Sequence, residues 1–302
     1  MSEKSLLSVR ALLTATILLA LSAGTLLAQG GGAGSVSRDG GARASSADLV
    51  GGTAQATVKR TMARRPIIKA ATQPVVRRRP ARPAAPGRPS LDADDYNEQG
   101  DTFLNAGKYT EAINAYRQAL RLKPGLAEAH YSLGWIYNEQ DQFPQAAASL
   151  QQAIRLKPNY PEAHKELGFA YRSMNQYNEA ISAYKQAIAL NGDYAQAYYE
   201  LGWTYNEMKQ YAQALVPLNQ ALLKKSDYPE ALNELGFAYR KLERYKEAIE
   251  SYREAVNLKN DYSLAYFGLG DVYFYNTNQY REAIEAYKQA LRLKPDNATA
   301  NY

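Results

Sequence analysis

Cysteine is absent from this chain of 302 residues, and histidine occurs only twice, as His130 and His164. The lack of cysteine excludes disulfides, a thiol nucleophile, cysteine metal sites and a lipid-modified N-terminal cysteine. Two histidines without a clear third ligand predict packing rather than a metal site. Glycine-rich phosphate loops, nucleophile elbows and paired catalytic carboxylates are also lacking. We therefore expect no enzymatic activity, no metal and no cofactor.

The positive charge of the chain is concentrated in one segment. Residues 29–91 hold twelve Lys and Arg against two Asp, whereas residues 92–302 hold 22 basic and 27 acidic residues. The pI of about 9.1 therefore describes that segment and not the remainder. For this reason we do not predict nucleic acid as a partner.

The N-terminus has the pattern of a secretory signal. Lys4 and Arg10 precede an apolar run over residues 11–21, which continues weakly to Ala28. We interpret residues 1–28 as a signal peptide that is cleaved after Ala28. The alternative is an uncleaved anchor, because residues 11–28 reach the ~18 residues that can span a bilayer. Either way we expect an exported protein that is periplasmic, envelope-associated or secreted.

Residues 29–91 are rich in Gly, Ala, Ser, Arg and Pro and contain no Tyr, Trp or Phe. Such a segment cannot bury enough apolar surface to offset its ordering entropy, so we expect a disordered basic linker. It is either a solvated spacer or a contact for an anionic lipid surface, a polyanion or the acidic repeats that follow. The run from Arg77 to Arg82 would make that contact.

From Ala93 onward the sequence repeats itself every 34 residues. A Leu-Gly pair followed three residues later by tyrosine marks five repeats, and Gln99, Gly100 and Phe103 mark the first. The pairs are Leu133-Gly134, Leu167-Gly168, Leu201-Gly202, Leu235-Gly236 and Leu269-Gly270. Alanine recurs behind them at Ala112, Ala146, Ala180, Ala214, Ala248 and Ala283. This pattern resembles the tetratricopeptide repeat across residues 93–296.

The resemblance implies an all-α fold, a right-handed α-solenoid of six helix-turn-helix repeats. The repeats would occupy residues 93–126, 127–160, 161–194, 195–228, 229–262 and 263–297 of a domain that spans 92–302. The residues themselves predict two amphipathic helices of about fourteen residues per repeat. Gly and Ala stand where the two helices approach closely, and large side chains fill the gaps between them. Neighbouring repeats must stack, because one hairpin cannot bury its apolar faces alone.

The sixth repeat and the two ends depart from the pattern. The sixth is longer by one residue, which predicts an enlarged turn at Asn276, Thr277 and Asn278. The first repeat opens with polar residues, as an N-terminal cap should. At the other end Ile284, Tyr287 and Leu291 would be partly exposed. That end is either frayed or a surface for self-association into a homo-oligomer.

The resemblance also implies that the first helices of successive repeats line a concave surface. Their fifth, ninth and twelfth positions fall on one side by helical geometry. We expect a peptide-binding groove there, because exposed aromatics interleaved with Asn and Arg suit a peptide. The candidates are Tyr131, Trp135, Asn138, Lys165, Phe169, Arg172, Tyr199, Trp203, Asn206, Asn233, Phe237, Arg240 and Phe267. The alternative is that these aromatics pack on neighbouring helices inside a tight superhelix.

Acidic residues align at the second and sixth positions of the same helices. They are Asp94, Glu128, Glu162 and Glu230, and then Glu98, Glu166, Glu200 and Glu234. They either complement helix dipoles or form an acidic rim that selects cationic partners. The sequence therefore predicts a non-catalytic adaptor or scaffold that binds an extended or helical segment of another protein, a cationic one if the acids form a rim. The alternative function is a structural or assembly element that self-associates through its C-terminal end or tethers to an anionic surface.

Overall fold

The computed structural model describes residues 91–294, which form α-helices joined by short turns and one π-helix, without a strand in that range. Helices alternate between two kinds. The A helices are α3 (Ala93–Asn105), α5 (Ala127–Glu139), α7 (Pro161–Ser173), α9 (Ala195–Glu207), α11 (Pro229–Lys241) and α13 (Ser263–Asp271). The B helices are α4 (Tyr109–Leu122), α6 (Phe143–Leu156), α8 (Tyr177–Leu190), α10 (Tyr211–Lys224), α12 (Tyr245–Leu258) and α14 (Tyr280–Leu293). The predicted α-solenoid of helix-turn-helix repeats is confirmed.

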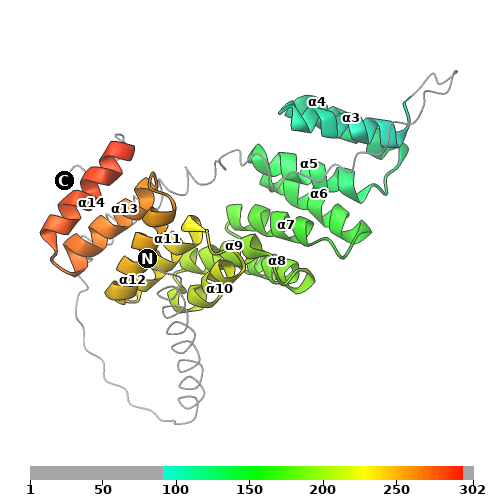
Figure 1. Ribbon diagram of the computed structural model, residues 1–302. Coiled ribbons are helices and arrows are strands. Elements are labelled where there is room, and N and C mark those ends of the chain that lie inside the picture. Colours follow the sequence, from blue (N-terminus) through cyan, green and yellow to red (C-terminus); the bar gives the residue numbers. More distant parts are fainter. Residues whose placement is uncertain (1–90, 295–302) are drawn as a thin grey trace, which may run out of the picture. The chain divides into compact units, whose positions relative to one another are not determined.

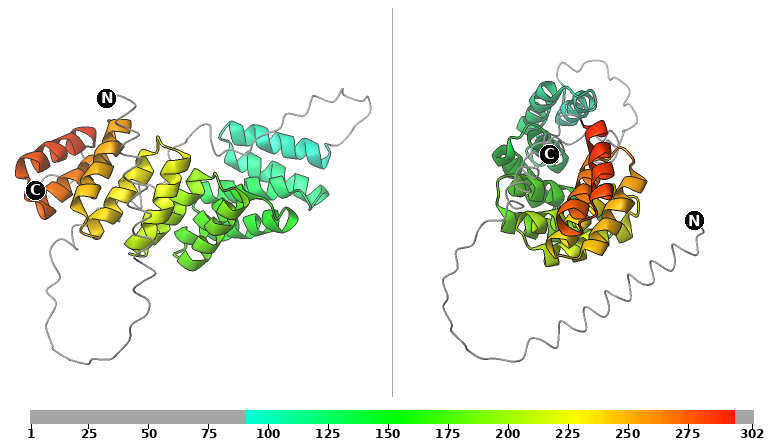
Figure 2. Two further views of the ribbon diagram at one scale, coloured as in Figure 1. Left: turned by 60° about the horizontal axis from the view of Figure 1, so that its bottom comes forward. Right: turned by 90° about the vertical axis from the view of Figure 1, so that its left-hand side faces the viewer.

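Each A helix packs against the B helix that follows it, and each B helix packs against the next A helix along the chain. Consecutive A helices also touch from α5 to α13. Figure 1 shows this succession in chain order, and Figure 2 shows the same helices from two further sides. The core is therefore a continuous strip made by neighbours, as stacked repeats require.

The turn from an A helix to its B helix needs one residue in the left-handed region. Asp141 has φ of 58°. Its N–H donates to the carbonyl of Asn138, and the next N–H, of Gln142, donates to the carbonyl of Tyr137. These two bonds form a Schellman motif, which satisfies the last carbonyls of the helix while the chain reverses. The residues at this place in the six repeats are Gly107, Asp141, Asn175, Lys209, Glu243 and Asn278.

Close approach within each helix pair is made by glycine on the A helix and alanine on the B helix. A Cβ added to Gly134 would lie 2.5 Å from Leu150 Cγ, and one added to Gly168 would lie 2.6 Å from Tyr184 Cε1. Ala146 and Ala180 are completely buried. The sequence expectation of small residues at the closest contacts is confirmed.

The sixth repeat accommodates its extra residue at the end of the A helix. A π-helix, η1 (Val272–Asn276), continues α13, and the N–H of Thr277 donates to the carbonyl of Val272 five residues earlier. Of the enlarged turn expected at Asn276 to Asn278, only Asn276 belongs to this π-helix, so the extra residue is taken up at the end of the A helix and not in the turn itself.

The two ends of the described part are unlike. At α3, Asp92 caps the helix and forms a reciprocal capping box with Asp95. At α14, Ile284 is 53% exposed, while Tyr287 and Leu291 are half-buried. Within residues 91–294 no helix combines the length and apolarity needed to cross a bilayer. The predicted signal peptide, the basic linker and the residues after Lys294 lie outside the described residues.

Candidate functional site

The side chains predicted to form an exposed aromatic groove are mostly buried. Trp135 is 7% exposed, Phe169 5% and Trp203 9%. The expectation of an exposed aromatic stripe is therefore wrong for these positions. The buried members of the predicted set are Tyr131, Trp135, Asn138, Lys165, Phe169, Arg172, Tyr199, Trp203, Asn206, Asn233 and Phe267. Phe237 and Arg240 remain half-buried.

The rings are buried because they pack on the preceding repeat. At Trp135, Phe169 and Phe237 the ring at position nine of the A helix meets the ring that begins the preceding B helix. Tyr109 and Trp135 lie 6.2 Å apart between centroids, and Phe143 and Phe169 lie 6.1 Å apart, both edge to face. This geometry is the favourable one for aromatic pairs. The aromatics thus contribute first to the contact between repeats.

Polar side chains at position twelve of the A helices are joined to acids of the next A helix. Asn138 Nδ2 donates to the carbonyl oxygen of Glu166 at 3.1 Å and to its Oε2 at 3.2 Å. Asn206 repeats this with Glu234, at 3.0 Å for both bonds. Because each Nδ2 donates to two acceptors, the orientation of both amides follows from the hydrogen bonds.

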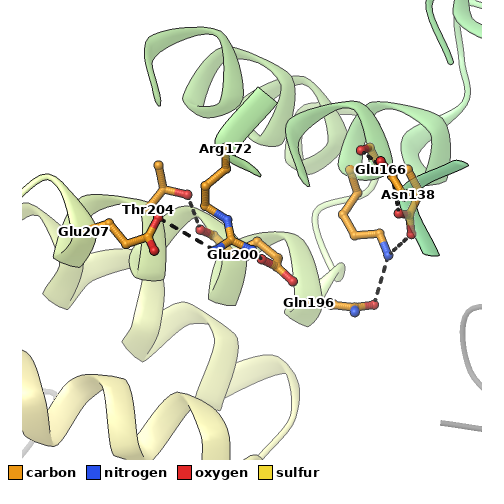
Figure 3. A network of polar contacts seen from close by, with 8 residues as sticks. Asn138, Glu166, Arg172, Gln196, Glu200, Thr204 and Glu207 are labelled. Carbon is orange, nitrogen blue, oxygen red and sulfur yellow. Dashed lines mark hydrogen bonds and ion pairs between the residues drawn. The ribbon is translucent and has the colours of Figure 1, made fainter. Parts of the chain in front are cut away.

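Arginine alternates with asparagine in this row. Arg172 Nη2 lies 3.0 Å from Glu200 Oε2, and its Nη1 lies 3.8 Å from Glu207 Oε2. The same guanidinium lies over the Trp203 ring at 3.6 Å from the centroid. Figure 3 shows Arg172 between the two carboxylates, beside the Asn138–Glu166 contact. We call the contacts of Asn138, Arg172 and Asn206 with acids of the next A helix the polar ladder. Its fourth contact joins Arg240 Nη1 and Asp271 Oδ2, which lie 3.0 Å apart.

Two acids of the ladder have different surroundings. Lys165 Nζ lies 2.6 Å from Glu166 Oε1, and both side chains are fully buried. In α11 the position of that lysine is taken by Asn233. Burial raises the pKa of Glu234 from 4.5 to about 7, although the hydrogen bond from Asn206 and the charge of Arg172 oppose the change. Glu234 is therefore the acid of the ladder that a change of pH near neutrality would alter.

The buried role of these glutamates was missed from the sequence, which assigned them to helix dipoles or an acidic rim. The sequence did contain a signal for this contact. Position twelve of one A helix and position six of the next A helix are always 28 residues apart. Asn138 and Glu166, Arg172 and Glu200, and Asn206 and Glu234 all show this separation. Complementary polar types at a constant separation across a repeat boundary indicate a contact.

The accessible part of the predicted face lies in the fifth repeat. Phe237 packs edge to face on Tyr211 at 5.8 Å. Its ring has the Arg240 guanidinium at 5.7 Å and the Lys241 ammonium at 5.8 Å. The Arg240 side chain is 15% exposed and retains the ion pair with Asp271. A half-buried ring beside two cations can bury an apolar side chain and donate to a carbonyl or carboxylate.

No group of three His, Cys, Asp or Glu among residues 91–294 could hold a metal ion. His130 Nε2 lies 3.2 Å from the carbonyl oxygen of Pro124, and His164 Nε2 lies 3.4 Å from that of Pro158. Burial lowers the pKa of both histidines. Each histidine thus contacts the turn that precedes its own helix.

Models of the tetratricopeptide repeat match residues 97–161, 196–224 and 227–296, and a model described as TPR repeat matches residues 168–209. None of the curated proteins matches the chain.

Solved structures share the fold. A crystal structure of MamA is 30% identical, covers 53% of this chain and 94% of its own, and has a TM-score of 0.51. YrrB, described as a TPR protein with an unusual peptide-binding site, is 20% identical over 63% of this chain and 97% of its own, with a TM-score of 0.52. PilF of Pseudomonas aeruginosa is 20% identical over 69% of this chain and 95% of its own, with a TM-score of 0.60. At 20% identity these two similarities concern the fold alone.

Proposed function

The chain belongs to the tetratricopeptide repeat family, and from this we propose that it is a non-catalytic scaffold that binds a peptide segment of another protein. The segment lies along the A helices, with its main contact in the fifth repeat. The observation that carries the proposal is the half-buried Phe237 with Arg240 and Lys241 beside it. The peptide-binding site in the description of YrrB is a precedent on the same fold.

The buried rows behind this face support binding by keeping it rigid. Rings at position nine connect A helices to the preceding B helix, and the polar ladder connects consecutive A helices. A rigid surface costs less ordering entropy when a ligand binds. Phe237 supplies an apolar contact, and the Arg240 guanidinium supplies donors in a planar fork. An extended or helical segment that carries an apolar side chain next to a carbonyl or carboxylate fits this arrangement.

A photo-cross-linking amino acid in place of Phe237 tests the proposal in the native cell. The matched control carries the same amino acid in place of Leu223, which is 68% exposed on α10, a B helix. We expect one protein to be captured from position 237 and not from 223. A synthetic peptide of the captured segment should then bind the full chain, and Phe237→Leu should weaken binding by roughly tenfold.

Three results would contradict a peptide-binding site at Phe237. The two positions could capture the same set of proteins, or position 237 could cross-link only to its own chain. The captured segment could also bind the Phe237→Leu variant and the parent equally. The variant must first match the parent in helicity and in unfolding midpoint, so that a loss of binding is not a loss of fold.

We also propose that the scaffold acts after export, in the periplasm, on the envelope or outside the cell. The support is the N-terminal sequence, in which Lys4 and Arg10 precede an apolar run that ends near Ala28. The basic segment that follows is then the connection between the point of export and the repeats.

A further inference from the structure

The sixth repeat carries a group of exposed apolar side chains. Phe274 is 42% exposed, Tyr275 48%, Tyr280 54% and Ile284 53%. We call these four residues the C-terminal aromatic patch. They come from η1 and the first part of α14, the orange and red helices of Figure 1.

The patch is contiguous. The Phe274 and Tyr275 rings lie 4.8 Å apart with their planes at 85°, and Phe274 and Tyr280 lie 5.6 Å apart at 70°. Ile284 follows Tyr280 by one helical turn on the same side of α14. The Tyr280 hydroxyl donates to Asn278 Oδ1 at 3.0 Å, which holds that ring in place. Phe274, Tyr275 and Tyr280 each keep more than two fifths of their surface exposed, so a ligand can contact all three rings.

Packing within the repeat array does not require Phe274 and Tyr275. The corresponding places in α5 and α9 hold Asn138-Glu139 and Asn206-Glu207. In three other repeats the ring that begins the B helix is met by a ring of the next A helix, as Tyr109 is by Trp135. In the sixth repeat Phe274, displaced by the extra residue of η1, meets Tyr280 instead. The insertion and the two additional rings therefore make a surface that the other repeats lack.

The chain itself contains a segment with the complementary chemistry. Proline occurs at every third residue, as Pro80, Pro83, Pro86 and Pro89, with Arg79, Arg82 and Arg88 each preceding a proline. Three residues is one turn of a polyproline II helix, so this spacing places the prolines along one side. Proline-rich segments of this kind bind between exposed aromatic rings. Guanidinium groups add favourable contacts with ring faces.

Charge favours the same pairing. Residues 77–90 carry five Arg and no acidic residue, whereas residues 91–294 carry 22 basic and 26 acidic residues. The first turn of α14 exposes both Arg281 and Glu282, so the attraction comes from the net charge of the domain and not from a single acid at the patch. A basic segment is therefore attracted to this domain at long range and selected by the rings at contact.

We propose that the C-terminal aromatic patch binds the proline- and arginine-rich segment at residues 77–90 of this chain. The contact joins two copies, because residues 77–90 lead directly into the first repeat of their own chain and the patch lies on the sixth. It does not depend on the peptide site proposed around Phe237, because the two surfaces share no residue.

Cross-linking within the purified full chain tests the contact directly. p-Benzoylphenylalanine replaces Tyr275, and the control carries it at Leu223, which is more exposed. We expect cross-links from position 275 to residues 77–90 and none to that segment from position 223. In a mixture of isotopically light and heavy chains we expect mixed light–heavy cross-links, because the segment comes from a second copy. Cross-links from position 275 only to residues 295–302, to other segments or to nothing would overturn it.

A binding titration keeps the proposal testable if the cross-linker is poorly oriented. A labelled peptide of residues 77–90 is titrated with full chain in which the four prolines are alanine, so that its own segment does not compete. Adding Phe274→Asn with Tyr275→Ser, residues that other A helices carry there, should weaken binding by roughly tenfold. Leu223→Ala should leave it unchanged. Equal binding by the patch variant, or by a peptide whose prolines are alanine but whose arginines remain, would overturn the proposal.

Discussion

Single residues set how closely the two helices of a repeat approach, and Gly134 is the clearest case. A Cβ there would meet Leu150 Cγ at 2.5 Å and the carbonyl oxygen of Ala146 at 3.2 Å. The second neighbour is backbone, so it cannot move aside as a flexible side chain could. We expect Gly134→Ala to lower the free energy of unfolding by about 2 kcal/mol, because the helix pair must separate.

Urea unfolding followed by helical circular dichroism measures this change. Gly125→Ala is the matched control, because a Cβ at Gly125 has nothing within 4 Å. It should alter stability by less than about 0.5 kcal/mol. Equal effects of the two substitutions would show that the A and B helices are not in close contact at Gly134.

Glu234 predicts a dependence of stability on pH. Burial raises the pKa of Glu234 in the folded chain from 4.5 to about 7, so the folded state binds more protons than the unfolded state between these values. Stability should therefore fall as pH rises from about 4.5 through about 7, by on the order of 2 kcal/mol. The negative charge of Glu207 adds to the rise in this pKa, and the positive charge of Arg172 opposes it.

Unfolding at pH 5.5 and pH 8 compares the parent with Glu234→Gln, which keeps an amide in place of the carboxyl. The variant should lose most of the difference between the two pH values. Glu162→Gln, on the exposed first turn of α7, is the control and should retain it. A parent whose stability is the same at both pH values would contradict a raised pKa.

At the scale of elements, the turn from A helix to B helix is strained in two repeats. Lys209 has φ of 60° and Glu243 has φ of 61°, and side chains with a Cβ disfavour this region. We expect Lys209→Gly and Glu243→Gly each to stabilise the chain by roughly 0.5–1 kcal/mol. Gly107→Ala, at the equivalent place with φ of 72°, should destabilise it. Thermal unfolding of the three variants measures these changes. A fall in stability for both glycine variants would show that Lys209 and Glu243 are not strained.

The elements themselves could be predicted because the repeat encodes them locally. Small residues such as Gly134 and Ala146 indicate where the A and B helices of a repeat are in close contact, and the regular period gives the number of helix pairs. The sequence did not predict the π-helix, since one additional residue in the sixth repeat can be placed in a turn or in a helix end. Only the packing of Val272 and Tyr273 into the core selects the helix end.

The candidate site was harder to predict, because exposure depends on how closely each A helix approaches the preceding B helix. Position nine of α5 is on the same side of its helix whether or not Tyr109 covers it. The 6.2 Å separation of the Tyr109 and Trp135 rings decides that Trp135 is buried. Residue types along one helix do not determine that separation, which comes from contacts between repeats.

At the scale of the whole molecule, the repeats, the basic segment and the N-terminal apolar run have separate roles. In a stacked array each repeat contacts only its neighbours, so a signal or a linker can be attached at one end without altering the core. The two proposed binding surfaces, around Phe237 and around Phe274, can therefore be tested independently in one chain.

The proposed export predicts a processed N-terminus. We expect cleavage after Ala28, so that the mature chain begins at Gln29 and has lost Lys4, Arg10 and the apolar run. Ala28→Arg should block processing, because a small residue is required at the cleavage site. Intact mass and N-terminal peptide sequencing of the exported protein measure both. A chain that retains Met1 and fractionates with membranes would show that residues 11–28 serve as an anchor, with the basic segment then held next to the bilayer surface.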